Sequence, residues 1–417
     1  MGGGMYYDSG GGGRRSWGGK LGRSGNESAG RHNWRLRYGS DEGGRTVNRD
    51  PVMLRAVDLA MSCLTLTCIV LSVLTLIVPY VPPARLGQLP VLALVAPLVY
   101  VVTVMTMLYW IIRWKWRRAA VTIVLALVGM MYAPRYFNPQ FRRSYGDETY
   151  PQSAIKVMSY NLRCFFPDGW GPQYTTDSIA AFVGRFAPDV ICFQEYLPAD
   201  ENMLHRFDSL LGDYRKKVLD EVDSPIAIYS RFRILGSERV AYLDADSMPQ
   251  GKGMWADLLV GADTVRVFNV HLNSTSIKSA DVDYIVNYRY MSDTARNSKI
   301  YDIIRRLNNN TVDRSYHVNA LAEAIQATRH ARILCGDFND PPMSYAYNTL
   351  SHGMKDAFRE CGRGYSHTYR GFFDLLRIDY ALFDERRFDV WSYEVPDSVC
   401  WSDHLPVCVR AELRSEI

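Results

Sequence analysis

The chain has 417 residues and a formal net charge of +4, which is the sum of two unlike parts. Residues 1–150 carry a net charge of +10, and residues 151–417 carry −6. The acidic second part disfavours non-specific binding to polyanions, because such binding depends on Lys and Arg displacing counterions. The basic first part lies beside long apolar runs, so it indicates membrane topology rather than nucleic-acid binding.

Residues 1–50 are rich in Gly, Ser and Arg and contain few aliphatic side chains. Such a segment cannot bury enough apolar surface to offset the entropy of ordering its backbone. We therefore expect residues 1–50 to form a disordered Gly/Arg-rich segment.

Residues 51–135 form the predicted membrane region. Leu59–Val78 and Leu89–Ile112 are uncharged runs of 20 and 24 residues, each long enough to cross a hydrocarbon core of roughly 30 Å. A third run, Ala119–Ala133, has 15 residues, so it fits either a short or tilted span or a helix lying in the interface. The sequence thus predicts two to three transmembrane helices in contact with a lipid bilayer, and no protein partner.

The basic residues predict the orientation of these helices. Ten Lys or Arg residues precede the first run, and Arg113–Arg118 contains four more, whereas Pro79–Gln88 contains only Arg85. Basic loops stay on the cytoplasmic side of spanning helices. Three spans would therefore export the rest of the chain, and two spans would keep it in the cytoplasm.

Beyond a predicted linker at residues 136–152, residues 153–417 alternate between short strand-like runs and helical stretches. This pattern predicts a four-layer α/β sandwich, in which two packed mixed sheets are flanked by helices. The expected strands are Ile155–Asn161, Val190–Gln194, Ile226–Tyr229, Thr264–Val270, Ile333–Cys335, Ile378–Phe383 and Val407–Leu413. The expected helices are Thr176–Phe186, Asp293–Leu307 and Asp313–Arg329.

Four segments of this domain end an apolar, strand-like run with Asn, Asp, Glu or His. They are Met158–Asn161, Phe193–Glu195, Gly336–Asn339 and Ser402–Pro406. Polar groups displayed where buried strands reach a rim are typical of catalytic sites. Hydrolysis of a phosphoester needs a divalent cation, a base for water, and groups that stabilise the leaving oxygen. The four segments together predict a magnesium-dependent phosphoester hydrolase.

Glu195 is the candidate metal ligand, with Asn161 beside it. Mg²⁺ prefers oxygen ligands and keeps several waters, so one or two carboxylates suffice, and Mn²⁺ suits the same ligands. Taken alone, a glutamate at a strand end is better explained as a solvated surface charge.

His404 is the candidate general base, because imidazole titrates near neutral pH. Asp379, at the end of a neighbouring strand, is the candidate carboxylate that orients it. His271 could donate to a non-bridging or leaving oxygen. Taken alone, His271 could equally be a satisfied residue of the core, and a lone histidine such as His404 is more often structural than catalytic.

Asp337 and Asn339 follow the strand Ile333–Cys335 and point to the same side of an extended chain. They could polarise the attacking water and hold the phosphate. A turn built from Asp, Asn and Pro is an equally good interpretation of this segment in isolation.

These residues, in this order, resemble the endonuclease/exonuclease/phosphatase family, which includes deoxyribonuclease I, abasic-site endonucleases, neutral sphingomyelinases and inositol polyphosphate phosphatases. The resemblance covers residues 153–415. It implies that Asn161 and Glu195 serve the metal and that His271 contacts the phosphate. It also implies that Asp337 and Asn339 position nucleophile and phosphate. By the same resemblance, Asp379 pairs with His404, and Asp403 completes the metal or base network.

The 65 residues between His271 and Asp337 depart from the family pattern. This long insertion contains Tyr284, Tyr288, Arg289 and Tyr290, and could be a specificity element or a cover for a sheet edge.

The membrane-anchored arrangement resembles bacterial members of the family, which implies a bacterial inner membrane. With three spans, the catalytic domain would be periplasmic. Lipid head groups or small phosphoesters are the expected substrates, and nucleic acid is the alternative. The only basic run after residue 151 is Arg215–Lys217, which favours the first class. A non-catalytic scaffold is disfavoured because all the candidate site residues are present.

Overall fold

The structure of the protein is a computed structural model that describes residues 51–139, 150–166, 172–197, 201–219, 225–243, 249–250, 253–274, 293–371 and 374–414. The segment expected to be disordered, residues 1–50, lies outside the described residues. So do residues 140–149 of the predicted linker and the insertion residues Tyr284, Tyr288, Arg289 and Tyr290.

Three long apolar helices precede the catalytic domain. They are α1 (Pro51–Ile77), α2 (Leu92–Ile112) and α3 (Trp116–Tyr132). With flanking turns, the stretches long and apolar enough to cross a membrane are Val52–Tyr80, Leu89–Ile112 and Trp116–Arg135. The third therefore has 20 residues rather than 15, because it begins at Trp116 and ends at Arg135, and so includes three arginines that lie outside Ala119–Ala133. The three helices suggest association with a membrane.

Buried polar side chains join α1 to α2. The hydroxyls of Ser72 and Thr103 lie 3.0 Å apart, and the indole nitrogen of Trp110 donates to the hydroxyl of Thr65 at 2.8 Å. Hydrogen bonds of this kind hold helices together in hydrocarbon, where apolar contacts alone provide little preference for a partner.

The catalytic domain contains two six-stranded sheets, both mixed. The first sheet runs, in spatial order, β15 (Phe388–Glu394), β16 (Val407–Leu413), β2 (Ile155–Asn161), β3 (Val190–Gln194), β5 (Ile226–Ser230) and β4 (Arg215–Leu219). The second runs β12 (Met354–Asp356), β14 (Asp379–Asp384), β11 (Ala331–Asp337), β10 (Asp263–His271), β9 (Gly253–Val260) and β6 (Arg233–Arg239). The central pairs β2·β3 and β10·β11 are parallel.

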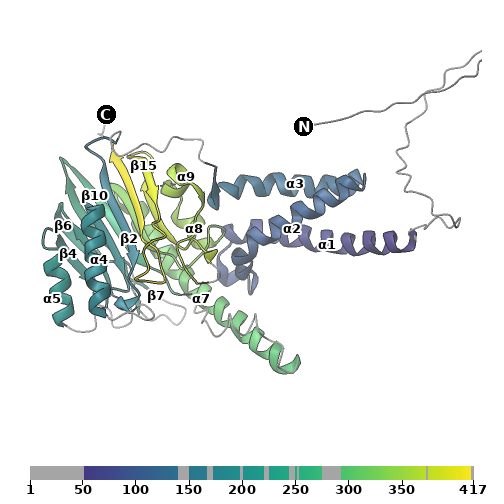
Figure 1. Cartoon of the computed structure of the whole chain (residues 1–417), viewed down its shortest axis with the longest axis horizontal. Coiled ribbons are helices and arrows are strands. Elements are labelled where there is room, and N and C mark those ends of the chain that lie inside the picture. Colours follow the sequence, from purple (N-terminus) through teal and green to yellow (C-terminus); the bar gives the residue numbers. More distant parts are fainter. Residues whose placement is uncertain are drawn as a thin grey trace, which may run out of the picture. The chain divides into compact units, whose positions relative to one another are not determined.

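The two sheets pack face to face, and helices cover their outer faces (Figure 1). Strand β2 illustrates why. Val157 faces the core between the sheets, whereas Met158 and Tyr160 face the core formed with α4 (Pro172–Phe186) and α5 (Glu201–Leu210). A strand buried on both faces carries apolar residues at consecutive positions, as β2 does at Val157 and Met158.

On the other side, α7 (Asp293–Ala327) and α8 (Tyr345–Leu350) cover the second sheet. The predicted four-layer α/β sandwich is confirmed.

One predicted helix boundary was wrong. The sequence predicted two helices separated near Asn308–Asn310, but α7 is a single helix of 35 residues. Its buried residues Ile303, Leu307, Val318 and Leu321 form one apolar stripe along the helix. Packing of that stripe therefore outweighs the weak helix propensity of the three asparagines.

Part of the predicted linker is hydrogen-bonded to the catalytic domain. After α3, the turn η4 (Ala133–Arg135) leads into β1 (Phe137–Asn138), which pairs with β13 (Gly364–Tyr365). The side-chain nitrogen of Asn138 also donates to the carbonyl oxygen of Phe358 at 3.1 Å. The chain is thus attached to the sandwich within a few residues of the third apolar helix.

Candidate active site

The strands of both sheets bring polar residues to one edge of the sandwich. In the second sheet, His271 at the end of β10 is paired with Asp337 at the end of β11, and Asp337 is paired with Asp379 at the start of β14. In the first sheet, Asn161 ends β2, and Glu195 follows the neighbouring parallel strand β3. Because parallel strands end at the same edge, residues far apart in sequence meet here.

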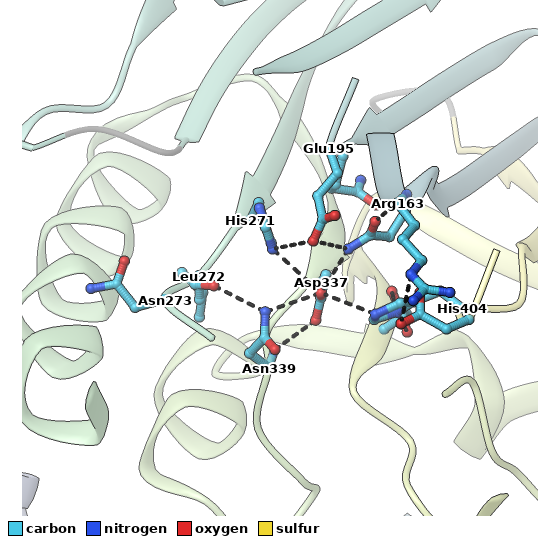
Figure 2. Close-up of polar contacts among 12 residues, drawn as sticks. Arg163, Glu195, His271, Leu272, Asn273, Asp337, Asn339 and His404 are labelled. Carbon is cyan, nitrogen blue, oxygen red and sulfur yellow. Dashed lines mark hydrogen bonds and ion pairs between the residues drawn. The ribbon is translucent and has the colours of Figure 1, made fainter. Parts of the chain in front are cut away.

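The carboxylate of Asp337 lies at the centre of this cluster (Figure 2). Its Oδ2 accepts hydrogen bonds from the side-chain nitrogens of Asn161 and Asn339, both at 3.0 Å, and its Oδ1 accepts from the backbone N–H of Asn339 at 2.8 Å. The Nε2 atoms of His271 and His404 lie 3.6 and 3.7 Å from Oδ2. Four residues from four segments therefore surround one buried carboxylate.

Burial raises the pKa of the Asp337 carboxyl, because the charged form is poorly solvated there. His404 and His271 oppose this shift and Asp379 adds to it, so that the pKa is about 6. Asp337 therefore titrates close to neutral pH, as functional carboxylates often do.

His404 and Asp379 form a buried pair. The Nδ1 atom of His404 lies 2.9 and 3.1 Å from the two carboxylate oxygens of Asp379. The hydroxyl of Thr368 accepts from the backbone N–H of Asp379, and that of Ser402 accepts from the backbone N–H of His404. Nδ1 is thus engaged by Asp379, while Nε2 faces Asp337.

Burial lowers the pKa of His404, but the charges of Asp379 and Asp337 and the hydrogen bond that His404 donates to Asp379 outweigh it and raise the pKa to about 10. Without further positive charge in the site, His404 is therefore protonated at neutral pH. A base must lose this proton, so a cation beside these carboxylates would favour the basic form of His404.

Glu195 lies on the open side of the cluster, with a side chain that is 30% exposed. Its Oε1 accepts from the side-chain nitrogen of Asn161 at 3.3 Å and lies 3.6 Å from Nε2 of His271. The backbone of Glu195 has φ of 48°, a conformation that favours glycine and that persists where surrounding structure imposes it. The carboxylate is held in the site at a cost in backbone strain.

Asp403 lies at the rim, where its carboxylate is 3.6 Å from Nε of Arg163. Arg163 was not among the residues chosen from the sequence. Its place near the site could have been predicted from the sequence, because it lies two residues after Asn161, in the turn that follows β2. Residues next to a site residue at a strand end lie at the same edge of the sheet.

Two further missed residues connect the sheets below the site. The side-chain nitrogen of Asn269 donates to the carbonyl oxygens of Phe193 and Ala227, and Gln194 donates to its side-chain oxygen at 2.8 Å. Both are fully buried amides within apolar strands, a placement that polar side chains adopt only when hydrogen-bonded. They fix the first sheet against the second directly before Glu195.

The oxygen atoms of this site suit a divalent cation. Asp337, Asp379 and His404 bring one ligand atom each within 4.8 Å of one another. Both carboxylate oxygens of Asp379 already face His404, so the more accessible carboxylate of Glu195, next to Asp337, is the better placed ligand. Carboxylate oxygens are the ligands that Mg²⁺ and Mn²⁺ prefer.

The side-chain oxygen of Asn161 accepts from the backbone N–H of Arg163 at 3.0 Å, so its nitrogen faces the carboxylates of Glu195 and Asp337. In this orientation Asn161 holds the two carboxylates together. Ligation of a metal through its oxygen would require the amide to turn over.

A family model described as "Endonuclease/Exonuclease/phosphatase family" matches residues 158–404, which is more than half of the chain and includes the whole cluster. The chain belongs to this family. Its members are typically metal-dependent phosphoester hydrolases, in agreement with the donor set around Asp337. A second family model, described as a domain of unknown function, matches residues 59–136.

Solved structures of the family align with the catalytic domain at low identity. An endonuclease/exonuclease/phosphatase from Bacteroides vulgatus is 20% identical, with 63% of this chain and all of that chain covered and a TM-score of 0.44. One from Beutenbergia cavernae is 18% identical, with 63% and 72% covered and a TM-score of 0.45. Humanized D. rerio TDP2 is 14% identical, with 63% and 100% covered and a TM-score of 0.43. A comparison with curated proteins found no match.

Proposed function

We propose that this family member is a divalent-cation-dependent phosphoester hydrolase that acts on lipid head groups or small phosphoesters at a bacterial inner membrane. The observation that carries the proposal is the carboxylate of Asp337, which lies between two imidazoles and next to the His404–Asp379 pair. Acid, base and anion-binding groups thus converge on one point, as phosphoryl transfer requires.

In this proposal His404 is the general base. Asp379 holds Nδ1, so Nε2 is the nitrogen available to take a proton from the attacking water. Asp337 receives and orients that water. His271 donates to the phosphate oxygens. The side-chain nitrogen of Asn339 donates to the carbonyl oxygen of Leu272 and to the carboxylate of Asp337, both at 3.0 Å, so Asn339 holds that carboxylate in place.

Glu195 and Asp337 would hold the cation, with Asp403 and Asn161 close by. Mg²⁺ and Mn²⁺ both suit these oxygen ligands. The cation, when bound, supplies positive charge that offsets the charge on the phosphoryl oxygens.

We place the catalytic domain on the periplasmic side. Ten basic residues precede the uncharged run Leu59–Val78, and four lie in Arg113–Arg118, between the runs Leu89–Ile112 and Ala119–Ala133. If all three helices span, both basic segments are cytoplasmic and residues after Arg135 are outside. A substrate in the outer face of that membrane would then lie on the same side as the site.

A nuclease of the same fold is the second candidate, and the position of the basic residues disfavours it. Arg215–Lys217 lie on the edge strand β4. Arg215 is paired with Ser230 of β5, and Ser230 is paired with Val190 at the start of β3. Glu195 follows the opposite end of β3. The basic run is therefore away from the catalytic edge, where a nucleic-acid groove would need it.

The substrate class is tested with the purified full chain in detergent micelles and Mg²⁺. Phospholipids, phosphorylated inositols, plasmid DNA and RNA are compared, with His404→Gln as the control for contaminating activity. We expect chelator-sensitive cleavage of a lipid or small phosphoester that His404→Gln lacks. Cleavage of plasmid DNA or RNA alone would replace this proposal with the nuclease.

A further inference from the structure

The turn that follows Asp337 is attached to the end of the third apolar helix. Arg135, the last residue of the stretch Trp116–Arg135, donates from Nη1 to the carbonyl oxygen of Pro342 at 2.9 Å. Pro342 is three residues beyond Asn339, whose φ of 50° sets the sharp exit from the site. The same turn is held on its other side by the hydroxyl of Tyr380, which donates to the carbonyl oxygen of Asp340 at 2.9 Å.

Arg135 has further contacts with this part of the catalytic domain. Its Nη2 donates to the side-chain oxygen of Asn348 at 3.3 Å, and its guanidinium lies 5.1 Å from the ring centre of Tyr347. Both partners are in α8, the helix that begins directly after the turn. Arg135 therefore holds the two ends of one short segment, from Pro342 to α8.

The backbone of Arg135 is connected to the segment that carries the partner of the base. Its carbonyl oxygen accepts from Nη2 of Arg377 at 2.8 Å, and Arg377 is buried in an ion pair with Asp356 at 2.9 Å. Arg377 lies two residues before Asp379. One residue at the end of the third apolar helix thus contacts both the turn after Asn339 and the segment before Asp379.

We infer that Arg135 is a positioning residue through which the membrane region sets the geometry of the active site. The inference rests on the proposed hydrolase function, because its effect is measured on that reaction. Asn339 and Asp379 must each keep their places relative to Asp337 and His404. A displacement of about 1 Å in such groups can cost up to about a hundredfold in rate.

The test compares Arg135→Ala with Arg85→Ala in the full chain. Arg85 is an exposed arginine in the turn η2 (Pro83–Arg85) between the first two apolar helices, so its replacement removes the same charge without touching the active-site turn. The substrate is bis(4-nitrophenyl) phosphate, which is water-soluble and needs no contact with a membrane. We expect Arg135→Ala to lower kcat by about tenfold with KM within about twofold, and Arg135→Lys, which retains one donor, to recover part of the loss.

Equal kcat values for Arg135→Ala and Arg85→Ala would overturn the inference. Amide hydrogen exchange of residues 338–344 provides a readout that needs no activity. We expect faster exchange there in Arg135→Ala but not in Arg85→Ala, and unchanged exchange would also overturn the inference. If the unmodified chain hydrolyses no phosphoester, the proposed function fails, and the exchange measurement alone decides whether Arg135 holds the turn.

Discussion

At the scale of single residues, Asp337 combines burial with an unusual number of polar partners. It is 1% exposed, and the loss of hydration alone would favour its protonated form. Two amides and two imidazoles compensate for that loss. Asp337 can therefore remain an ionised acceptor in a place where an isolated carboxylate would be neutral.

The raised pKa of His404 predicts how stability depends on pH when no cation is bound. Asp379 and Asp337 raise this pKa from 6.5 to about 10 against the effect of burial. A group whose pKa is higher in the folded state contributes stability that is fully present below pH 6.5 and is lost as the pH rises through 10.

In chelator, we therefore expect the thermal midpoint of the unmodified chain to fall more between these pH values than that of His404→Gln. Scanning calorimetry or circular dichroism at both pH values checks this. The titration of Asp337 does not contribute to this difference in thermal midpoint, because its pKa of about 6 lies below this pH range. The same fall in both proteins would mean that His404 is not charged in the folded state.

At the scale of elements, α7 belongs to the active site although most of it lies on the outside of the second sheet. Its Arg314 is 1% exposed, donates from Nε to the carbonyl oxygen of Asn273 at 2.8 Å, and lies 2.7 Å from the carboxylate of Asp340. Asn273 follows His271 by two residues, and Asp340 follows Asn339. The insertion therefore joins the two loops that carry these site residues.

Replacing Arg314 with Met should leave the buried carboxylate of Asp340 without its cation, at a cost of about 3–5 kcal/mol. For a domain of this size, that corresponds to a fall in the thermal midpoint of about 10 °C. Arg305, an exposed arginine of the same helix, gives the matched control Arg305→Met, which should change the midpoint little.

The double variant Arg314→Met with Asp340→Asn should recover part of the loss, because it removes the unpaired charge as well. A midpoint in Arg314→Met equal to that in Arg305→Met would show that the ion pair contributes nothing to folding.

Sequence patterns predict the central elements better than the peripheral ones. Strands β2, β3 and β16 have the predicted bounds because most of their residues are buried and their apolar residues stand close together. Strands β6 and β9 were not predicted, because their residues are only partly buried and the polar positions interrupt the pattern. The break expected within α7 is absent because packing of its apolar stripe decides its length.

For the site, the residue types and their order at strand ends predicted which side chains gather at the catalytic edge. The sequence could not predict that Asp337, rather than Glu195, is the centre of the cluster. That follows from the pairing of β11 with both β10 and β14, and strand order is not visible in a single sequence. The contacts of Arg135 and Arg314 depend on the same long-range packing.

At the scale of the molecule, residues 56–417 form one compact unit that includes both the apolar helices and the sandwich. Three hydrogen bonds of Arg135 and the pairing of β1 with β13 connect these parts. This short connection keeps the sandwich next to the end of the third apolar helix.

The most direct test of the proposed hydrolase is the hydrolysis of bis(4-nitrophenyl) phosphate by the full chain, with Mg²⁺ and with excess chelator. Glu195→Ala and His404→Ala are measured beside the unmodified chain, and circular dichroism verifies that both are folded. We predict hydrolysis that chelator abolishes, that His404→Ala lowers by about 10²–10⁴-fold, the usual contribution of a general base, and that Glu195→Ala lowers strongly because a cation ligand is lost. Full activity in either folded variant, or activity unaffected by chelator, would contradict the role assigned to this site.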